Sequence, residues 1–132
     1  MQKVRIMALG GLDEDGKNMY VIEIADDIFV IEAGIKYPES AQLGVEYIIP
    51  DFTYLIENKK RIKGVFITHG HDDVMSALPF LLKEIDVDIY ATALTAKYIE
   101  PYLDSRKRVR IIKRNDDITI GTCKIHSFPV MQ

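Results

Sequence analysis

The chain has 132 residues, of which 48% are hydrophobic and 28% are charged. This balance is typical of a globular domain and excludes the disordered and fibrous classes of protein. The longest uninterrupted apolar run, residues 77–82, contains a proline and is far shorter than the roughly 18 residues that a membrane span requires. The sequence therefore predicts one domain without a membrane-spanning segment.

Charge and cysteine content restrict the function further. The net charge of −3 argues against a surface coated with positive charge, although it allows a local channel for nucleic acid. Charged and apolar residues alternate from Lys3 to Ile6, unlike the continuous apolar core of a secretory signal. The lone Cys123 cannot form an intrachain disulfide, and a small strand residue is a commoner explanation for it than a catalytic thiol. We expect a cytoplasmic protein.

The first third of the chain shows the alternation of apolar residues that is typical of strands. It predicts an antiparallel meander of three strands, at residues 3–9, 19–25 and 28–32, with a tight connection at residues 26–27. Residues 35–50 have no period and contain two prolines, so they are predicted to form a long irregular loop. Loops of this length are more often functional than accidental. Asp51 is predicted to cap a short helix that runs through Asn58.

The rest of the chain alternates between predicted strands and helices. Strands are expected at residues 64–68, 88–91, 108–112, 118–120 and 122–128, the last two joined at Gly121. Apolar residues between Val74 and Ile85 recur every three or four positions, which predicts a helix that Pro79 kinks or divides. A second helix is expected from Thr95 to Leu103, capped by Thr95. This order indicates helices packed on a mixed sheet, an α/β (α+β) fold.

A glycine-rich segment at residues 11–18 has the spacing of a phosphate-binding loop. Asn18 stands where that motif needs Ser or Thr, three carboxylates lie where backbone amides should face a polyphosphate, and a strand follows instead of a helix. Nucleotide binding is therefore rejected. A turn is the favoured interpretation, and the hypothesis that Asn18 or the acidic residues line a nearby site stays open.

The segment Thr68-His69-Gly70-His71-Asp72-Asp73-Val74 lies between a predicted buried strand and a predicted amphipathic helix. Histidines at positions i and i+2 of an extended segment point the same way. Neutral imidazole is a preferred zinc ligand, and Asp73 adds an oxygen ligand two residues later. The alternative is a pair of surface histidines in a turn.

Two further features, a third histidine and a cluster of basic residues, are interpreted together with this segment. His126 is the only other histidine, and with His69 and His71 it would complete the three-nitrogen set of a catalytic zinc site. Alone it is more often structural. A basic cluster matches either a phosphate-binding track or a solvated strand face, and it consists of Arg106, Lys107, Arg108, Arg110, Lys113 and Arg114.

These residues resemble the metallo-β-lactamase superfamily, whose signature is H-x-H-x-D-H between a strand and a helix. More narrowly, the chain resembles bacterial ribonuclease J. The resemblance covers the chain in several ordered blocks: GGLDEDGKNMYVIE at 10–23, IFVIEAG at 28–34, IPDFTYL at 49–55, IKGVFITHGHDD at 62–73, ALPFLL at 77–82 and HSFP at 126–129.

The resemblance implies the N-terminal part of a four-layer αββα sandwich over residues 1–132. His69, His71 and His126 match the ligands of the first metal, and Asp73 matches a ligand of the second metal and is taken as catalytic. The metal is expected to be Zn²⁺ or Mn²⁺, with one site at most in this segment. A β-CASP domain that clamps RNA and a C-terminal domain are expected beyond residue 132.

The chain departs from the family pattern at two positions. Val74 occupies the place of the last histidine of the signature, which leaves a degenerate ligand position at the second metal. Glu32 stands where the family usually has Asp, and its extra methylene is expected to shift a hydrogen bond that supports a ligand. Such erosion resembles the second ribonuclease J paralogue of Gram-positive bacteria.

The resemblance supports two hypotheses of different class. The first is a metal-dependent 5′–3′ exoribonuclease or endoribonuclease of low activity that acts in mRNA decay and rRNA maturation. The second is a non-catalytic, RNA-binding subunit of a complex with an active ribonuclease J paralogue. Both imply RNA as a partner and a homo- or hetero-oligomer, and the residues leave open whether the whole protein is an enzyme. A small-molecule hydrolase fits the blocks outside the histidine segment less well.

Overall fold

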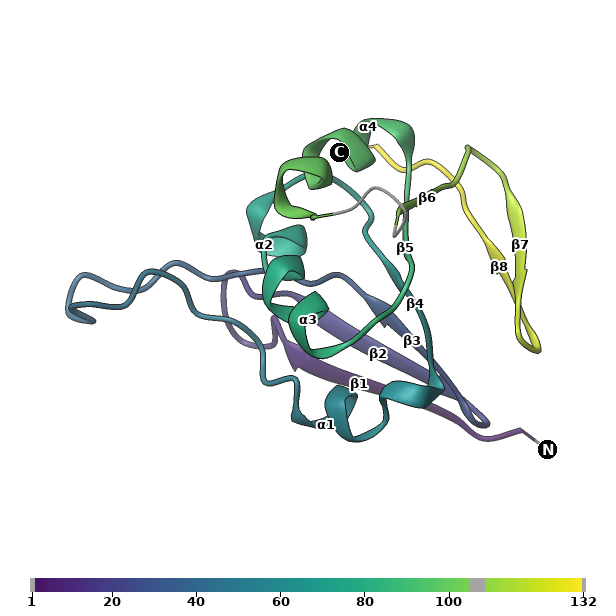
Figure 1. Cartoon of the computed structure of the whole chain (residues 1–132), viewed down its shortest axis with the longest axis horizontal. Helices are drawn as coiled ribbons and strands as arrows, with labels where there is room; N and C mark the ends of the chain where they lie inside the picture. The colour runs from purple at the N-terminus through teal and green to yellow at the C-terminus, as the bar shows by residue number, and fades with distance from the viewer. Residues whose placement is uncertain (1, 105–108, 132) are drawn as a thin grey trace.

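The computed structural model describes residues 2–104 and 109–131. Its main feature is a six-stranded mixed sheet in the order β1-β2-β3-β4-β5-β6, accompanied by a separate hairpin of β7 and β8 (Figure 1). The first three strands pair antiparallel, and the pairs from β3 to β6 are parallel. The strands are β1 (Val4–Gly10), β2 (Met19–Ile24), β3 (Asp27–Ile31), β4 (Ile62–Phe66), β5 (Ile89–Ala91), β6 (Val109–Ile111), β7 (Asp117–Ile120) and β8 (Cys123–His126).

The helices are short and connect the parallel strands. They are α1 (Thr53–Glu57), α2 (Asp72–Met75), α3 (Leu78–Glu84) and α4 (Ala93–Ile99), with 3₁₀ turns η1 (Lys59–Arg61) and η2 (Glu100–Tyr102). Pro79 lies in the first turn of α3, where a missing backbone N–H costs nothing, so it divides the predicted helix into α2 and α3. In the part of the chain that the structure describes, no helix combines the length and apolar character needed to cross a membrane.

Two helix caps differ from the sequence prediction. The prediction that Thr95 caps the fourth helix was wrong: Thr92 is the N-cap, and its hydroxyl accepts a hydrogen bond from the Thr95 N–H. The helix therefore starts earlier than predicted. Asp51 accepts hydrogen bonds from the N–H and hydroxyl of Thr53, but the N-cap position belongs to Phe52. Neighbouring residues of similar capping chemistry make the first helical residue hard to fix from sequence.

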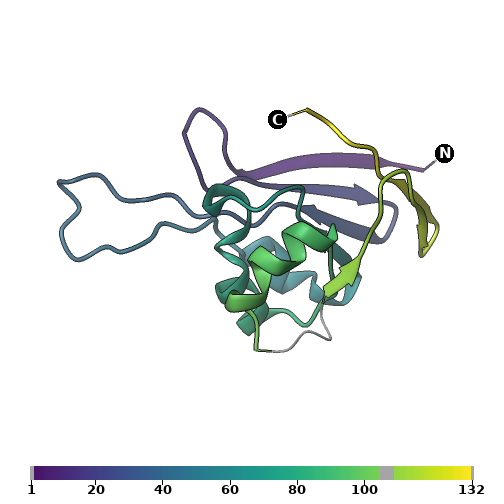
Figure 2. The same ribbon diagram turned by 90° about the horizontal axis from the view of Figure 1, so that it is seen from above.

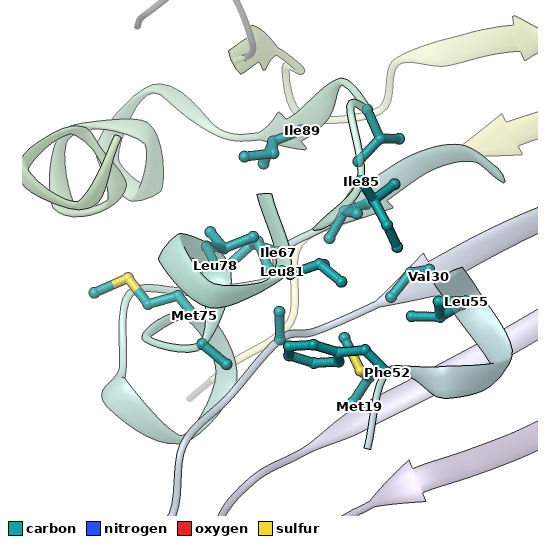
Figure 3. Packing of buried hydrophobic residues seen from close by; sticks show 14 of the residues in the cluster. Met19, Val30, Phe52, Leu55, Ile67, Met75, Leu78, Leu81, Ile85 and Ile89 are labelled. Atoms are coloured by element: carbon teal, nitrogen blue, oxygen red, sulfur yellow. The ribbon is translucent and has the colours of Figure 1, made fainter. Parts of the chain in front are cut away.

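The sheet is covered on both faces. The larger core lies between the sheet and the helices, and side chains from β2, β3, α1 and α3 meet in it, among them Met19, Val30, Leu55, Leu78 and Leu81 (Figure 3). The opposite face carries a smaller cluster of Phe29, Phe66 and Tyr90, against which apolar side chains of the β7–β8 hairpin pack. The central strands β3, β4 and β5 are therefore apolar on both sides, as parallel strands usually are, whereas β1 and β6 are largely exposed.

A long loop, residues 35–50, leaves the body of the protein at the end of β3 (Figures 1 and 2). Its two arms are joined by backbone hydrogen bonds between Lys36 and Ile48, each 2.8 Å long. Most residues beyond this bridge are exposed, and Leu43 at the far end is 91% exposed. The irregular loop expected from the sequence is thus present, and only its base is held by the fold.

The segment after β3 fixes the start of α2. Ala33 N–H donates to the Val74 carbonyl, and Ile35 N–H donates to the Asp72 carbonyl. Gly34 lies between these two bonds, and a Cβ placed on it would lie 1.6 Å from the Asp73 carbonyl oxygen. Only glycine allows the two backbones to approach this closely.

We predict that Gly34→Ala forces α2 away from β3. Overpacking of this kind costs about 3 kcal/mol or more in the free energy of unfolding, and it should also weaken metal binding at the segment that follows β4. Urea unfolding and metal titration measure the two effects. Gly44→Ala is the control: Gly44 has a positive φ of 80°, so alanine strains the backbone there, but no atom lies within 4 Å of the added Cβ. Equal losses in both variants would contradict the prediction.

Candidate metal centre

The histidine segment follows the carboxyl end of β4 and leads directly into α2. The rings of His69 and His71 meet edge to face, with centroids 4.6 Å apart. Asp73 follows in the first turn of α2. One ligand atom from each of His69, His71 and Asp73 lies within 4.8 Å of the other two. The structure therefore brings together three of the four ligands predicted from the sequence.

This group fits a transition metal ion. Because Zn–N and Zn–O bonds are about 2.0–2.2 Å long, two ligand atoms of one ion lie at most about 4.4 Å apart. The observed spread of up to 4.8 Å exceeds this limit by only a few tenths of an ångström. His71 is exposed, and His69 and Asp73 are half-buried, so small side-chain rotations are free to close the difference. Two imidazoles and a carboxylate are also the donors that zinc and manganese accept.

Asn18 holds Asp73 in place from the β1–β2 loop. The Asn18 backbone N–H donates to the Asp73 carbonyl at 3.1 Å, and the side-chain amide donates to the same carbonyl at 3.0 Å. The amide also donates to the carboxylate Oδ2 at 3.2 Å. The other carboxylate oxygen, Oδ1, takes no part in these bonds. The glycine-rich loop thus contributes Asn18 to the site, whereas its Glu14 forms ion pairs with Lys17 and Lys36.

Glu32 supports His69 through Thr68. It is buried, has a positive φ of 68°, and accepts hydrogen bonds from the Thr68 N–H and hydroxyl, both at 2.8 Å. The same hydroxyl lies 2.8 Å from His69 Nδ1. When Glu32 is ionised, the hydroxyl gives its one proton to that carboxylate and therefore accepts the proton of His69 Nδ1–H. This tautomer leaves the lone pair of His69 Nε2 free for a metal.

The carboxyl group of Glu32 has an unusual affinity for protons. Burial raises its pKa to about 7, and the negative charge of Asp73 acts in the same direction, while the two hydrogen bonds from Thr68 oppose the shift. A metal cation beside Asp73 would favour the ionised form. The protonation of Glu32 is therefore linked to occupancy of the site.

His126 lies on β8, outside the group of three. It is paired across the hairpin with Asp117, and its Nδ1 is 2.7 Å from the Asp117 carboxylate. This hydrogen bond is the main reason that the pKa of Asp117 lies below its usual range. The side chain of His126 is about half exposed. Its role as a third nitrogen ligand stays a prediction.

Val74 is the buried residue directly after Asp73, with 4% of its surface exposed. Its backbone N–H donates to the His71 carbonyl, and its carbonyl accepts from Ala33. The side chain carries no lone pair, so it supplies no ligand at the position that the resemblance assigns to a histidine.

The basic cluster is only partly described. Arg106, Lys107 and Arg108 lie outside the described residues. Arg110 is exposed on β6, and its Nε donates to Asp88 at 2.6 Å, which matches a solvated strand face. Lys113 and Arg114 are also exposed.

Residues 12–127 match the sequence model of the metallo-β-lactamase superfamily, so the chain belongs to that superfamily. Solved structures agree on the fold. A flavo di-iron protein from Thermotoga maritima covers 94% of this chain with a TM-score of 0.62 and 18% identity, over 36% of its own length. A B3 metallo-β-lactamase covers 93% with a TM-score of 0.60 and 15% identity, over 48% of its own length. The predicted fold class is thus confirmed.

Similar curated proteins are named ribonuclease J2, which confirms the resemblance drawn from the sequence. The protein from Bacillus subtilis is 43% identical over 132 residues, covering 96% of this chain and 24% of its own length. One from Staphylococcus epidermidis is 42% identical over 117 residues, covering 86% and 21%. One from Streptococcus pyogenes is 42% identical over 110 residues, covering 83% and 20%. The chain spans only a fifth to a quarter of these relatives.

We predict that Thr68→Val weakens metal binding about 10- to 100-fold, because His69 loses the acceptor that fixes its tautomer. The backbone bond from residue 68 to Glu32 is kept, so the fold should survive. Isothermal titration with zinc measures the effect. Thr119→Val, on an exposed position of β7, is the control and should bind zinc as the wild type does. Unchanged affinity in Thr68→Val would show that the hydroxyl does not orient the ring.

We predict that the metal-free protein loses stability between pH 5 and pH 8 because of Glu32. Its folded pKa of about 7 exceeds the unfolded value near 4.5, so the folded state binds the proton more tightly, and stability falls as the pH rises through this range. The loss amounts to as much as about 3 kcal/mol. Glu32→Gln should flatten the dependence, whereas exposed Glu46→Gln should not. Urea unfolding at several pH values tests this, and equal slopes in wild type and Glu32→Gln would contradict it.

Proposed function

We propose that this chain is the N-terminal part of a metal-dependent ribonuclease of the J type, which hydrolyses phosphodiester bonds of RNA. The observation that carries the proposal is the convergence of His69, His71 and Asp73 at the end of β4. It occurs in a chain that is 39–43% identical to proteins named ribonuclease J2. The action of the whole protein in mRNA decay and rRNA maturation, in the cytoplasm, belongs to the same proposal.

His69, His71 and Asp73 would hold Zn²⁺ or Mn²⁺, and this ion would supply a Lewis acid for water and for a phosphoryl oxygen. The resemblance assigns Asp73 to a second metal, but its distance from the two imidazoles also allows it to bind the same ion as they do. We assign His126 as a further ligand of this ion. Its bond to Asp117 supports the assignment, because metal-binding histidines commonly donate one ring N–H to a carboxylate and coordinate through the other nitrogen. Asn18 and Thr68 act indirectly by orienting Asp73 and His69.

The activity is expected to be weak, because Val74 offers no nitrogen to a second metal. A second candidate function follows from the same residue. Its burial makes Val74 part of the packing, which favours a non-catalytic, RNA-binding subunit that pairs with an active ribonuclease J paralogue. The 132-residue segment alone is expected to be inactive in either case, since the resemblance assigns RNA clamping to a β-CASP domain that follows it.

We predict that the full-length protein cleaves 5′-monophosphorylated RNA in the presence of Mn²⁺ or Zn²⁺, and that Asp73→Ala lowers the rate at least about 100-fold through loss of a ligand. Glu57→Ala, an exposed carboxylate on α1, is the control and should cleave normally. Cleavage that persists in Asp73→Ala would contradict the assigned site. RNA binding without cleavage would favour the subunit hypothesis, and absence of both would overturn both functions.

Two substitutions at position 74 test whether Val74 is only a packed core residue or fills the place of a missing metal ligand. Val74→Ala should lower the free energy of unfolding by about 1–3 kcal/mol and leave metal binding unchanged. Val74→His should increase affinity for a second metal by about tenfold or more, because it restores a nitrogen ligand. Calorimetric titration with zinc or manganese compares the two variants. Identical binding curves would mean that position 74 does not face the metals.

A further inference from the structure

An aromatic pocket of about 240 Å³ is lined in part by Asp72, the residue between the candidate metal ligands His71 and Asp73. Three separate segments of the chain form it: the base of the 35–50 loop, the α2–α3 region and η2. The residues that matter for its chemistry are Tyr37, Tyr47, Asp72, Ser76, Phe80 and Tyr102. None of them is among the candidate metal ligands, and the proposed function leaves them without a role.

The pocket brings several aromatic rings together. Tyr47 makes tilted ring contacts with both Tyr37 and Phe80: the ring centroids are 6.2 and 6.4 Å apart, and the interplanar angle is 56° in each pair. Tyr37 is 59% exposed, Tyr47 48% and Tyr102 38%, so much of each ring is not used by the core. Exposed aromatic faces that converge on a hollow are a common platform for stacking of planar ligands.

The polar side of the pocket is the carboxylate of Asp72. Tyr37 donates its hydroxyl proton to Oδ2 at 2.8 Å, and Ser76 donates to Oδ1 at 2.9 Å. These bonds hold the carboxylate in one orientation, but each oxygen accepts about two hydrogen bonds in total. The pocket therefore offers free acceptor capacity to a ligand that carries N–H groups.

The residues that line this pocket disfavour the phosphate of a nucleic acid as its occupant, although the Lys83 ammonium lies 6.0 Å from the centroid of the Phe80 ring. Among the described residues that line it, none is Lys, Arg or His, and Asp72 would repel an anion. A neutral aromatic ring with amino or imino N–H groups fits both the stacking faces and the acceptors. A nucleobase has this chemistry.

The place of the pocket connects it to the metal centre. Asp72 lies between His71 and Asp73 in the sequence, and consecutive Cα atoms are about 3.8 Å apart. A base held at Asp72 would therefore keep its own backbone close to the metal ligands.

We infer that this pocket binds a nucleobase of the single-stranded RNA whose phosphodiester lies at the metal centre. The inference rests on the proposed function. It assigns Tyr47 as the stacking residue and Asp72 as the acceptor for base N–H groups. The pocket thereby sets the position of the strand, while the phosphates are left to contacts elsewhere.

The test uses the full-length protein, Mn²⁺ and a single-stranded, 5′-monophosphorylated oligouridine RNA of ten nucleotides. Tyr47→Leu keeps apolar volume but removes the aromatic face, and it should weaken RNA binding about 5- to 100-fold. Tyr47→Phe should restore the affinity. The slope of affinity against salt concentration should stay the same in all variants, because no phosphate contact is removed. Leu43→Ala, at the exposed end of the same loop, is the matched control and should bind as the wild type does.

A double-mutant cycle identifies the partner of Tyr47. An abasic nucleotide is placed at each position of the RNA in turn. At one position the loss of the base and Tyr47→Leu should be non-additive, so that the variant loses little further affinity. Full additivity at every position would overturn the inference while leaving the proposed function intact, because the wild type would still bind and cleave RNA.

Two other results would also overturn the inference. If Tyr47→Leu lowers the thermal stability of the full-length protein and leaves RNA affinity unchanged, another segment of the protein fills the pocket. If the wild type neither binds nor cleaves the RNA, both the inference and the proposed function fail. Metal titration of Tyr47→Leu should match that of the wild type, and a loss of metal binding would show that the residue acts through the metal centre instead.

Discussion

The close backbone contact between residues 33–35 and the first turn of α2 is the constraint on which the site depends. Three carbonyls in this turn, those of Asp72, Asp73 and Val74, accept N–H groups from Ile35, Asn18 and Ala33. Helix N-termini are usually held by side-chain caps, but His71 at the N-cap makes no such bond. The sheet edge and the β1–β2 loop therefore position α2, and with it Asp73. A four-residue helix has little stability of its own, so α2 depends on these hydrogen bonds with neighbouring segments.

Glu32 and Asn18 orient the candidate metal ligands, and Glu32 does so at a cost in stability. Glu32 is buried with a positive φ, which is unfavourable for a residue with a side chain, and its ionised form is further opposed by burial. In exchange for this cost, Glu32 orients the Thr68 hydroxyl, which in turn contacts His69 Nδ1 and favours one tautomer of the ring. Asn18 orients the Asp73 carboxylate in a similar way, through a hydrogen bond from its uncharged side-chain amide. Strained or poorly solvated groups of this kind gather at functional sites, because the geometry that they impose is needed there.

The sequence predicted those parts of the structure that depend on local pattern. Alternation located the strands, and the position of the histidine segment between a buried strand and an apolar helix located the candidate metal ligands, which the fold brings together. The division at Pro79 followed from the missing N–H of proline. The contacts of Asn18 with Asp73 and of Glu32 with Thr68 join residues 55 and 36 positions apart, and no periodicity encodes such distances. Aromatic residues of three segments form the pocket, so their grouping is visible only in the fold.

Val74 changes how folding and metal binding are coupled. A histidine buried at this position would need a metal or a hydrogen-bonding partner, since an unsatisfied polar ring is unfavourable in a packed environment. Stability would then depend on metal, as it does wherever ligands are built into a core. Valine removes this dependence because its buried surface stabilises the fold in the absence of metal. The candidate ligands His69 and His71 are more exposed than Val74, so water can solvate their rings when no metal is bound. Valine at position 74 therefore favours a fold that persists whether or not metal is bound.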